Sequence, residues 1–408
     1  MRVFRRIMLG SGIDIDALPD TQKLYYKATA KVTPKSNSLG SPAIANKWDS
    51  TTGEGMIVCS RDITIIDNDA FSGASVLTSI TIPDSVTSIG NSAFSGCTSL
   101  TSITIPSSVT SIGKSAFYEC TSLTSVTIPD SVTEIGSEAF DSCTSLTSVT
   151  IPDSVTEIGY GVFSDCTSLT SVTIGNGVTS IESFAFYGCY LLESITMSPL
   201  LASIKYSVFT NSDNITSVYI KNLSNWCSAI KYSSPSNSKG TTKYIYNDNE
   251  ITKVVVPNDV VVMGGRSFYC CDNITDVIIN DNVTHIGEYD FYKCGKLSNL
   301  TLGSNVKVIR ESAFSDCYQL RDVFFPASVT RIEHGAFMLC INVKSYDFST
   351  HTVIPELSNS NAFNQPVIIF KIIVPDALYD DWIAATNWSA YASYIIKKSD
   401  WDASLTTE

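Results

Sequence analysis

The chain has 408 residues, with 27 Lys and Arg against 40 Asp and Glu, which gives a formal net charge of −13. Charged residues make up 16% and apolar residues 44%, so the chain can bury a core and is not a disordered acidic segment. The acidic balance argues against a nucleic-acid partner, because phosphate binding requires clustered Lys and Arg. No apolar run approaches the ~18 residues of a membrane-spanning helix.

Residues 1–48 lack a repeat and are predicted to form an N-terminal capping region. The first residues are cationic, but the apolar stretch 7–9 is shorter than the roughly 7–15 residues at the centre of a signal peptide. We therefore expect no cleavable signal. Residues 23–33 alternate between apolar and polar side chains, which predicts a pair of strands.

Residues 49–348 follow a 23-residue repeat, most visible in its phenylalanines. These recur 23 residues apart in two registers, namely Phe71, Phe94, Phe117, Phe140, Phe163, Phe186 and Phe209, then Phe268, Phe291, Phe314 and Phe337. The 59 residues from Phe209 to Phe268 correspond to one repeat of 23 plus an expanded one of 36, placed at about residues 221–256. Coils of this kind bury their apolar side chains against stacked neighbours.

Each repeat predicts one strand followed by turns. In residues 100–120, Leu100, Ile103 and Ile105 alternate with Ser and Thr, which is the period of a strand with one buried face. Pro106 ends the strand because it has no N–H to donate. Fourteen such strands are expected, the first at Ile57 and the last at Ile372.

The expanded repeat and the C-terminal region depart from this pattern. Residues 233–242 are rich in Ser, Pro, Lys and Gly and are expected on the surface, and 244–251 predict a hairpin around Asn247-Asp248. Residues 349–408 predict the last strand and a helical C-terminal cap. Asp376 is expected to cap the first helix, and Ser389 to begin a second.

The repeat resembles the BspA-like class of leucine-rich repeat. Its pattern here is Leu-x-x-Ile-x-Ile-Pro-x-x-Val-x-x-Ile-Gly-x-x-Ala-Phe-x-x-Cys, and the likeness covers about residues 54–348. The resemblance implies a leucine-rich-repeat solenoid with a parallel β-sheet on the concave face, short turns or helices on the convex side and about 14 coils, capped at both ends. It also implies an adhesive role at a cell surface or outside the cell, and no catalytic residues; a cytoplasmic or phage-associated location stays open.

Nine of the 12 cysteines occupy one repeat position and predict a structural ladder of buried thiols. They are Cys97, Cys120, Cys143, Cys166, Cys189, Cys271, Cys294, Cys317 and Cys340. Rungs ~5 Å apart would permit disulfides geometrically, but single-file order disfavours defined pairs. Cys270-Cys271 has no C-x-x-C partner, so no metal site is predicted.

Stacked carboxylates are the other candidate for chemistry. Glu134 and Glu157 share a repeat position, as do Asp130 and Asp153, and a retaining glycosidase holds two carboxyl groups ~5 Å apart. These residues lie on polar turns, where solvated side chains are the simpler interpretation. No nucleotide, zinc or hydrolase motif occurs, so we expect neither catalysis nor a cofactor.

Outward strand positions divide the chain into two halves. The first six coils carry Ser and Thr, as at Ser102 and Thr104. Later coils carry larger and charged residues, which we predict as one continuous binding strip because hot spots favour aromatic and charged anchors. The strip consists of Tyr219, Lys253, Asp276, Ile278, Asp322 and Phe324. Sequence drift in degenerate repeats is an alternative explanation for these larger residues. The regular Ser-x-Thr rows resemble an ice-binding face, but that function is disfavoured because the rows do not continue into the second half of the chain.

The sequence therefore favours a non-catalytic binding or adhesion protein. Its expected partner is a protein or glycan of a host or neighbouring cell. The alternative is a structural spacer or stalk on a cell envelope or phage particle.

Overall fold

The computed structural model describes residues 14–236, 241–365 and 370–405, and the chain forms two compact units. Unit 1 extends to Ser198 and includes Lys205–Asn214; unit 2 contains Pro199–Ile204 and the chain from Ile215 onward. The cationic first residues and part of the 233–242 excursion lie outside the described residues. Each unit is a solenoid of parallel strands, so the predicted fold class is confirmed.

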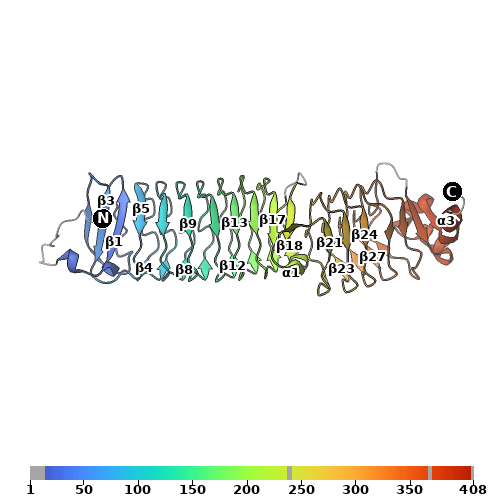
Figure 1. Ribbon diagram of the computed structural model, residues 1–408, viewed down its shortest axis with the longest axis horizontal. Helices are drawn as coiled ribbons and strands as arrows, with labels where there is room; N and C mark the ends of the chain where they lie inside the picture. The colour runs from blue at the N-terminus through green and yellow to red at the C-terminus, as the bar shows by residue number, and fades with distance from the viewer. Residues whose placement is uncertain (1–13, 237–240, 366–369, 406–408) are drawn as a thin grey trace. The chain divides into compact units, whose positions relative to one another are not determined.

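Each coil of unit 1 contributes to two parallel ladders (Figure 1). The first comprises β5 (Leu77–Thr81), β7 (Ser102–Thr104), β9 (Ser125–Thr127), β11 (Ser148–Thr150), β13 (Ser171–Thr173) and β15 (Ser194–Thr196). The second, which was not predicted, comprises β4 (Ile65–Ile66), β6 (Ser88–Ile89), β8 (Ser111–Ile112), β10 (Glu134–Ile135), β12 (Glu157–Ile158) and β14 (Ser180–Ile181). Both ladders are interrupted once, between β9 and β11 and between β10 and β12.

The core lies between the ladders and contains a stack of phenylalanine rings. Along Phe71 to Phe209 neighbouring ring centroids are 5.1–5.9 Å apart with planes within 8° of parallel. Unit 2 repeats the stack from Phe268 to Phe363 at 5.2–5.9 Å. The 23-residue period thus places one ring of each coil on the ring of the next.

The N-terminal cap differs from the expected pair of strands. It contains the turns η1 (Ile15–Ala17) and η2 (Asp20–Gln22) and the strands β1 (Lys23–Ala28), β2 (Ala43–Trp48) and β3 (Glu54–Cys59). β1 pairs antiparallel with both β3 and β5. Ile57, expected in the first parallel coil, therefore pairs antiparallel with Leu24 in the cap. The inserted strand β1 covers the end of the parallel sheet, which would otherwise expose unpaired backbone.

Unit 2 contains the remaining coils. Its strands are β16 (Ser203–Ile204), β17 (Ser217–Ile220), β18 (Ile230–Lys231), β19 (Lys243–Tyr246), β20 (Asn249–Glu250), β21 (Lys253–Val255), β22 (Asp276–Ile278), β23 (His285–Ile286), β24 (Asn299–Thr301), β25 (Val308–Ile309), β26 (Val323–Phe324), β27 (Arg331–Ile332), β28 (Ser345–Asp347), β29 (Glu356–Leu357) and β30 (Lys371–Val374).

The expanded repeat contains a helix and a complete coil strand. Helix α1 (Leu223–Ser228) is capped by Asn222, whose side chain accepts a hydrogen bond from the Asn225 N–H at 3.0 Å. The hairpin predicted around Asn247-Asp248 is present as β19 and β20, with both turn residues at positive φ. β19 also pairs in parallel with β17, so this segment is a coil of the solenoid as well as a hairpin.

Two expectations for the C-terminal cap are wrong. β30 is not the last strand, because β31 (Ile395–Lys397) pairs in parallel with it. Asp376 does not cap the helix that follows it: it begins the turn η3 (Asp376–Leu378), and its carboxylate accepts a hydrogen bond from the Ser399 N–H at 3.0 Å, near the start of a later helix. The remaining elements are α2 (Tyr379–Ala384), η4 (Trp388–Tyr394) and α3 (Lys398–Leu405). Trp382 and Trp388 are buried against Phe348 and close the core.

Candidate functional site

The outward strand positions of unit 1 form two rows of hydroxyl groups. The register pairs Ser102 with Ser125 and Thr104 with Thr127, and these four side chains are exposed. Within the described residues they make no side-chain hydrogen bond, whereas Thr101 at the side of the strand donates to the carbonyl of the preceding coil at 3.1 Å. This face is therefore polar, regular and without a large anchor.

The strand face of unit 2 carries the six residues predicted as a binding strip. Tyr219 lies on β17 and is 40% exposed, and Phe324 lies on β26 and is 49% exposed. Lys253 on β21 stands directly beside Asp276 on β22. Large apolar side chains therefore reach solvent on this face, in contrast to the hydroxyl rows of unit 1.

The expected continuity of the strip is only partly present. β17 belongs to the sheet that contains β19, β21 to the sheet β21-β22-β24, and β26 to the sheet β26-β28-β30-β31, so the residues belong to three separately hydrogen-bonded sheets. Only Lys253, Asp276 and Ile278 share one of these sheets. Asp322 immediately precedes β26, and its carboxylate accepts a hydrogen bond from the Ser345 hydroxyl at 2.7 Å.

Three further residues belong to the strand face of unit 2 but were absent from the predicted strip. Val255 is 50% exposed and is paired with Ile278. Ile245 is paired with Tyr219, and Lys243 with Ser217. Ile245 was missed because 244–251 were interpreted only as a hairpin, and Lys243 because it lies between that segment and the polar excursion 233–242. The alternation of Lys243, Tyr244 and Ile245, with Tyr244 fully buried, was the available signal.

Charges on this face are held by local contacts. The Asp276 carboxylate accepts hydrogen bonds from the Thr275 hydroxyl at 2.6 Å and the Asn299 amide at 2.9 Å, and these bonds lower the pKa of Asp276. Lys243 forms a 2.8 Å ion pair with Glu250, whose pKa is lowered by that contact. The face therefore presents ordered charges of both signs beside apolar side chains.

The cysteine ladder faces the core. All twelve cysteines are buried and free of disulfides. The Cys97 thiol donates to the Phe71 carbonyl at 3.2 Å, and the Cys120 thiol to the Phe94 carbonyl at the same distance. In one coil without a ladder cysteine, the Ser212 hydroxyl donates to the Phe186 carbonyl at 2.8 Å. These three residues thus share a donor to the carbonyl of an earlier coil, whereas the Cys271 thiol donates to the side-chain oxygen of Asn273 at 3.0 Å.

The repeated carboxylates do not form a buried pair. Glu134, Glu157, Asp130 and Asp153 are all exposed. Asp153 accepts hydrogen bonds from the N–H of Asn176 at 2.7 Å and from its amide group at 2.9 Å. These side chains lie on solvent-exposed turns, and the contact of Asp153 with Asn176 connects two neighbouring turns.

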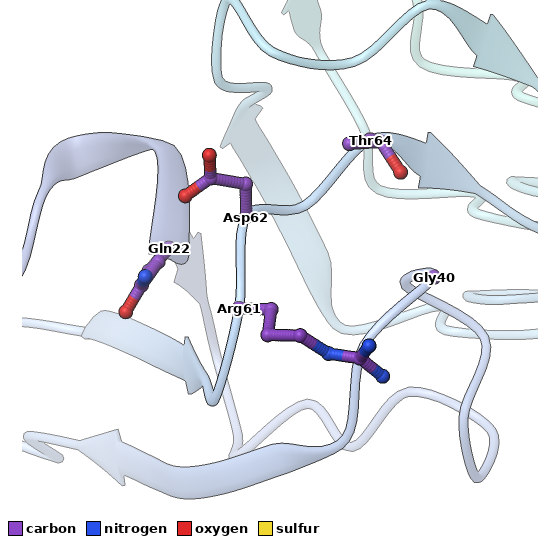
Figure 2. Close-up of a pocket in the computed structure, with 5 residues that line it drawn as sticks. All are labelled: Gln22, Gly40, Arg61, Asp62 and Thr64. Atoms are coloured by element: carbon purple, nitrogen blue, oxygen red, sulfur yellow. The ribbon is translucent and has the colours of Figure 1, made fainter.

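One pocket of about 420 Å³ lies in the N-terminal cap (Figure 2). It is lined by Gln22, Gly40, Arg61, Asp62 and Thr64. The Arg61 side chain extends toward Gly40, while the Asp62 carboxylate lies on the side of Gln22 and accepts a hydrogen bond from the Thr21 hydroxyl at 2.7 Å. The lining is polar and holds one charge of each sign, on Arg61 and Asp62.

Over the described ranges, no group of three or more His, Cys, Asp or Glu side chains is placed to hold a metal ion. Over the same ranges, none of the helices combines the length and apolar character needed to cross a bilayer.

Comparisons with known proteins identify the repeat. The model of the BspA type leucine rich repeat region, in six copies, matches residues 55–166, 110–238 and 239–366. A leucine-rich repeat protein from Bacteroides ovatus is similar over 82% of this chain and 88% of its own, with 25% identity and a TM-score of 0.57. A leucine rich cell surface protein from Faecalibacterium prausnitzii is 30% identical over 80% of this chain and 86% of its own, with a TM-score of 0.47. The comparison with curated proteins gives no match.

Proposed function

The chain belongs to the BspA-type leucine-rich-repeat family, and on this premise we propose that it is a non-catalytic binding protein whose unit-2 strand face engages a protein partner. The similar solved structures are bacterial leucine-rich repeat proteins, and one of them is described as a cell surface protein. These similarities support a protein-binding or adhesion-type role. We extend this to a location at the cell surface or outside the cell.

One observation carries the choice of surface: the strand face of unit 2 exposes large apolar side chains. Tyr219, Val255 and Phe324 are each 40–50% exposed although they lie on strands. Exposed apolar residues bordered by charges are the usual composition of an interface, and aromatic residues are enriched among those that dominate binding energy. Lys253 and Asp276 supply charges of both signs beside them.

A protein suits this face because the anchors are distributed over several coils. Tyr219 lies on β17, Val255 on β21 and Phe324 on β26, which are strands of three different coils. A stable protein interface covers about 800 Å² per partner, which requires contacts over many strands. The spacer alternative is supported instead by the regular hydroxyl rows of unit 1, which offer no distinguished contact point.

The test is a binding screen of the purified full chain against arrays of extracellular-matrix and cell-surface proteins. For any protein bound, the paired change Tyr219→Ala and Phe324→Ala should weaken binding at least tenfold. The matched pair Thr104→Ala and Thr127→Ala, on the strand face of unit 1, should change it less than twofold. Circular dichroism of both variants checks that they remain folded. The proposed surface would be rejected if no protein on any array were bound, or if only the paired threonine variant lost binding.

A further inference from the structure

A second surface, away from the strand faces, contains clustered aromatic side chains. In unit 1 the Tyr160 and Phe184 ring centroids lie 5.5 Å apart at 58°, and Phe184 and Tyr187 lie 5.6 Å apart at 61°. Tyr160 is 48% exposed and the other two are half-buried. None of the three belongs to the phenylalanine stack of the core, so core packing does not require them.

The backbone makes an aromatic residue at position 184 unusual. In every coil of unit 1 the residue two positions before the stacked phenylalanine has φ between 52° and 63°, a region that bulky side chains seldom adopt. Other coils of unit 1 carry Ser, Gly, Asp or Glu here, as at Ser92, Gly161, Asp69 and Glu138, and none of them carries an aromatic residue. Phe184 occupies this position with φ 63° although the fold requires no ring there.

Two of the three ring positions recur in unit 2, where the third ring, Tyr269, follows its stacked phenylalanine and does not precede it as Tyr160 does. Tyr289 occupies the equivalent left-handed position with φ 56°. Its ring lies 5.6 Å from that of Tyr292 and 6.5 Å from that of Tyr269, and Tyr269 and Tyr292 are stacked at 5.1 Å. In both units the second ring follows the stacked phenylalanine by one residue, as Tyr187 does. Recurrence in a separate unit is difficult to attribute to random drift.

The size of the unit-1 cluster limits the partner. An aromatic side chain offers about 150–250 Å², so three rings that are at most half exposed leave on the order of 200 Å² free. This is well below the ~800 Å² that one partner contributes to a protein interface. The area corresponds to one or two small rings, and not to a protein domain.

Polar groups adjoin the rings. The Asn211 amide donates to the Tyr187 hydroxyl at 3.0 Å, and in unit 2 the Tyr289 hydroxyl donates to Glu311 at 2.7 Å. A pyranose ring has an apolar C–H face and a rim of hydroxyls that both donate and accept, so it matches ring faces bordered by phenol and amide groups. A proline ring has an apolar face but no hydroxyl rim.

We propose that the Tyr160, Phe184 and Tyr187 cluster binds pyranose rings of a neutral polysaccharide, with the Tyr269, Tyr289 and Tyr292 cluster as a weaker second site. The second site is weaker because Arg266 and Lys293 lie 4.7 and 5.3 Å from the Tyr289 and Tyr292 ring centroids and cover part of those faces. This proposal concerns a surface other than the proposed protein interface, so the two proposals are tested independently.

The experiment is affinity electrophoresis of the full chain in gels containing a soluble β-glucan, xyloglucan or galactomannan. At least one polymer should retard the parent. Phe184→Ser with Tyr187→Ser should weaken retardation at least tenfold; both substitutions introduce a residue that other coils carry at those positions, as at Ser92 and Ser95, so the coil should fold. Tyr289→Ser should weaken it two- to threefold.

Tyr118→Ala is the matched control, because Tyr118 also follows a stacked phenylalanine but has Ser115 in place of a second ring. It should retain the parent's retardation, as should Tyr219→Ala on the strand face. No retardation by any polymer, equal loss in Tyr118→Ala, or binding of a proline-rich peptide to the cluster in place of the polymers would overturn the proposal.

Discussion

Phe140→Ala should destabilise the protein by about 4 kcal/mol. The Phe140 ring is fully buried, with the Phe117 and Phe163 centroids 5.1 and 5.4 Å away on its two sides. Loss of the side chain forfeits about 2–3 kcal/mol of apolar transfer. A residual cavity on the order of 80 Å³ adds ~2 kcal/mol at 24 cal/mol per Å³. The cavity should persist because the Phe140 N–H donates to the Val162 carbonyl at 2.9 Å and fixes the backbone of the coil.

The assay is urea denaturation of the parent and variant followed by circular dichroism. Phe184→Ala provides the matched control, since it removes the same atoms from a half-buried surface ring in the same unit and should cost less than about 1 kcal/mol. If Phe140→Ala and Phe184→Ala had equal denaturation midpoints, the stacked-ring core would not be the main source of stability.

Three further predictions concern buried polar groups. Burial raises the pKa of Cys97 to about 12, so thiol titration at pH 8 should label few of the 12 cysteines in native protein and most after denaturation; rapid native labelling of the majority would contradict the buried ladder. Burial lowers the pKa of Lys231 from 10.5 to about 8. Between these two pH values the unfolded lysine keeps its proton and the folded lysine has lost it, so the free energy of unfolding rises with pH. Relative to Lys231→Met, the parent should therefore gain about 3 kcal/mol of unfolding free energy between pH 8 and 10.5. A pH-independent difference in urea denaturation between the two proteins would refute this. Ser212→Ala should cost about 1–2 kcal/mol by removing the donor to the Phe186 carbonyl, and Ser212→Cys should restore stability to within about 0.5 kcal/mol; equal stability of all three proteins would show that this rung contributes nothing.

The repeat made the central architecture predictable from the sequence. Phe117, Cys120 and Ile103 recur at a fixed period, and the structure buries each of them at the core. A periodic pattern specifies a coil because every coil has the same neighbours. The second ladder was missed because strands of two residues, such as β8, have too little alternation to be recognised.

The caps and the expanded coil could not be derived in the same way. Insertion of β1 between β3 and β5 depends on pairing partners distant in the sequence. Lys231 is buried, and its ammonium donates to the carbonyls of Trp226 and Ala229 near the end of α1, although nothing in the sequence around it distinguishes it from an exposed lysine. Such contacts depend on the tertiary fold and leave no periodic signal.

The candidate sites were predictable to different extents. Tyr219 and Phe324 are recognisable because they interrupt a Ser and Thr pattern at known strand positions. The Tyr160, Phe184 and Tyr187 cluster was missed because its members come from turns of two coils, and the left-handed backbone at position 184 becomes apparent only in three dimensions.

Hydrogen–deuterium exchange of the full chain, with and without a protein captured in the array screen, tests the proposed binding surface most directly. The proposed function predicts slowed exchange at residues 217–220, 253–255, 276–278 and 322–324, with residues 102–104 and 125–127 unchanged. Protection confined to 102–104 and 125–127, or absent from both strand faces, would contradict it.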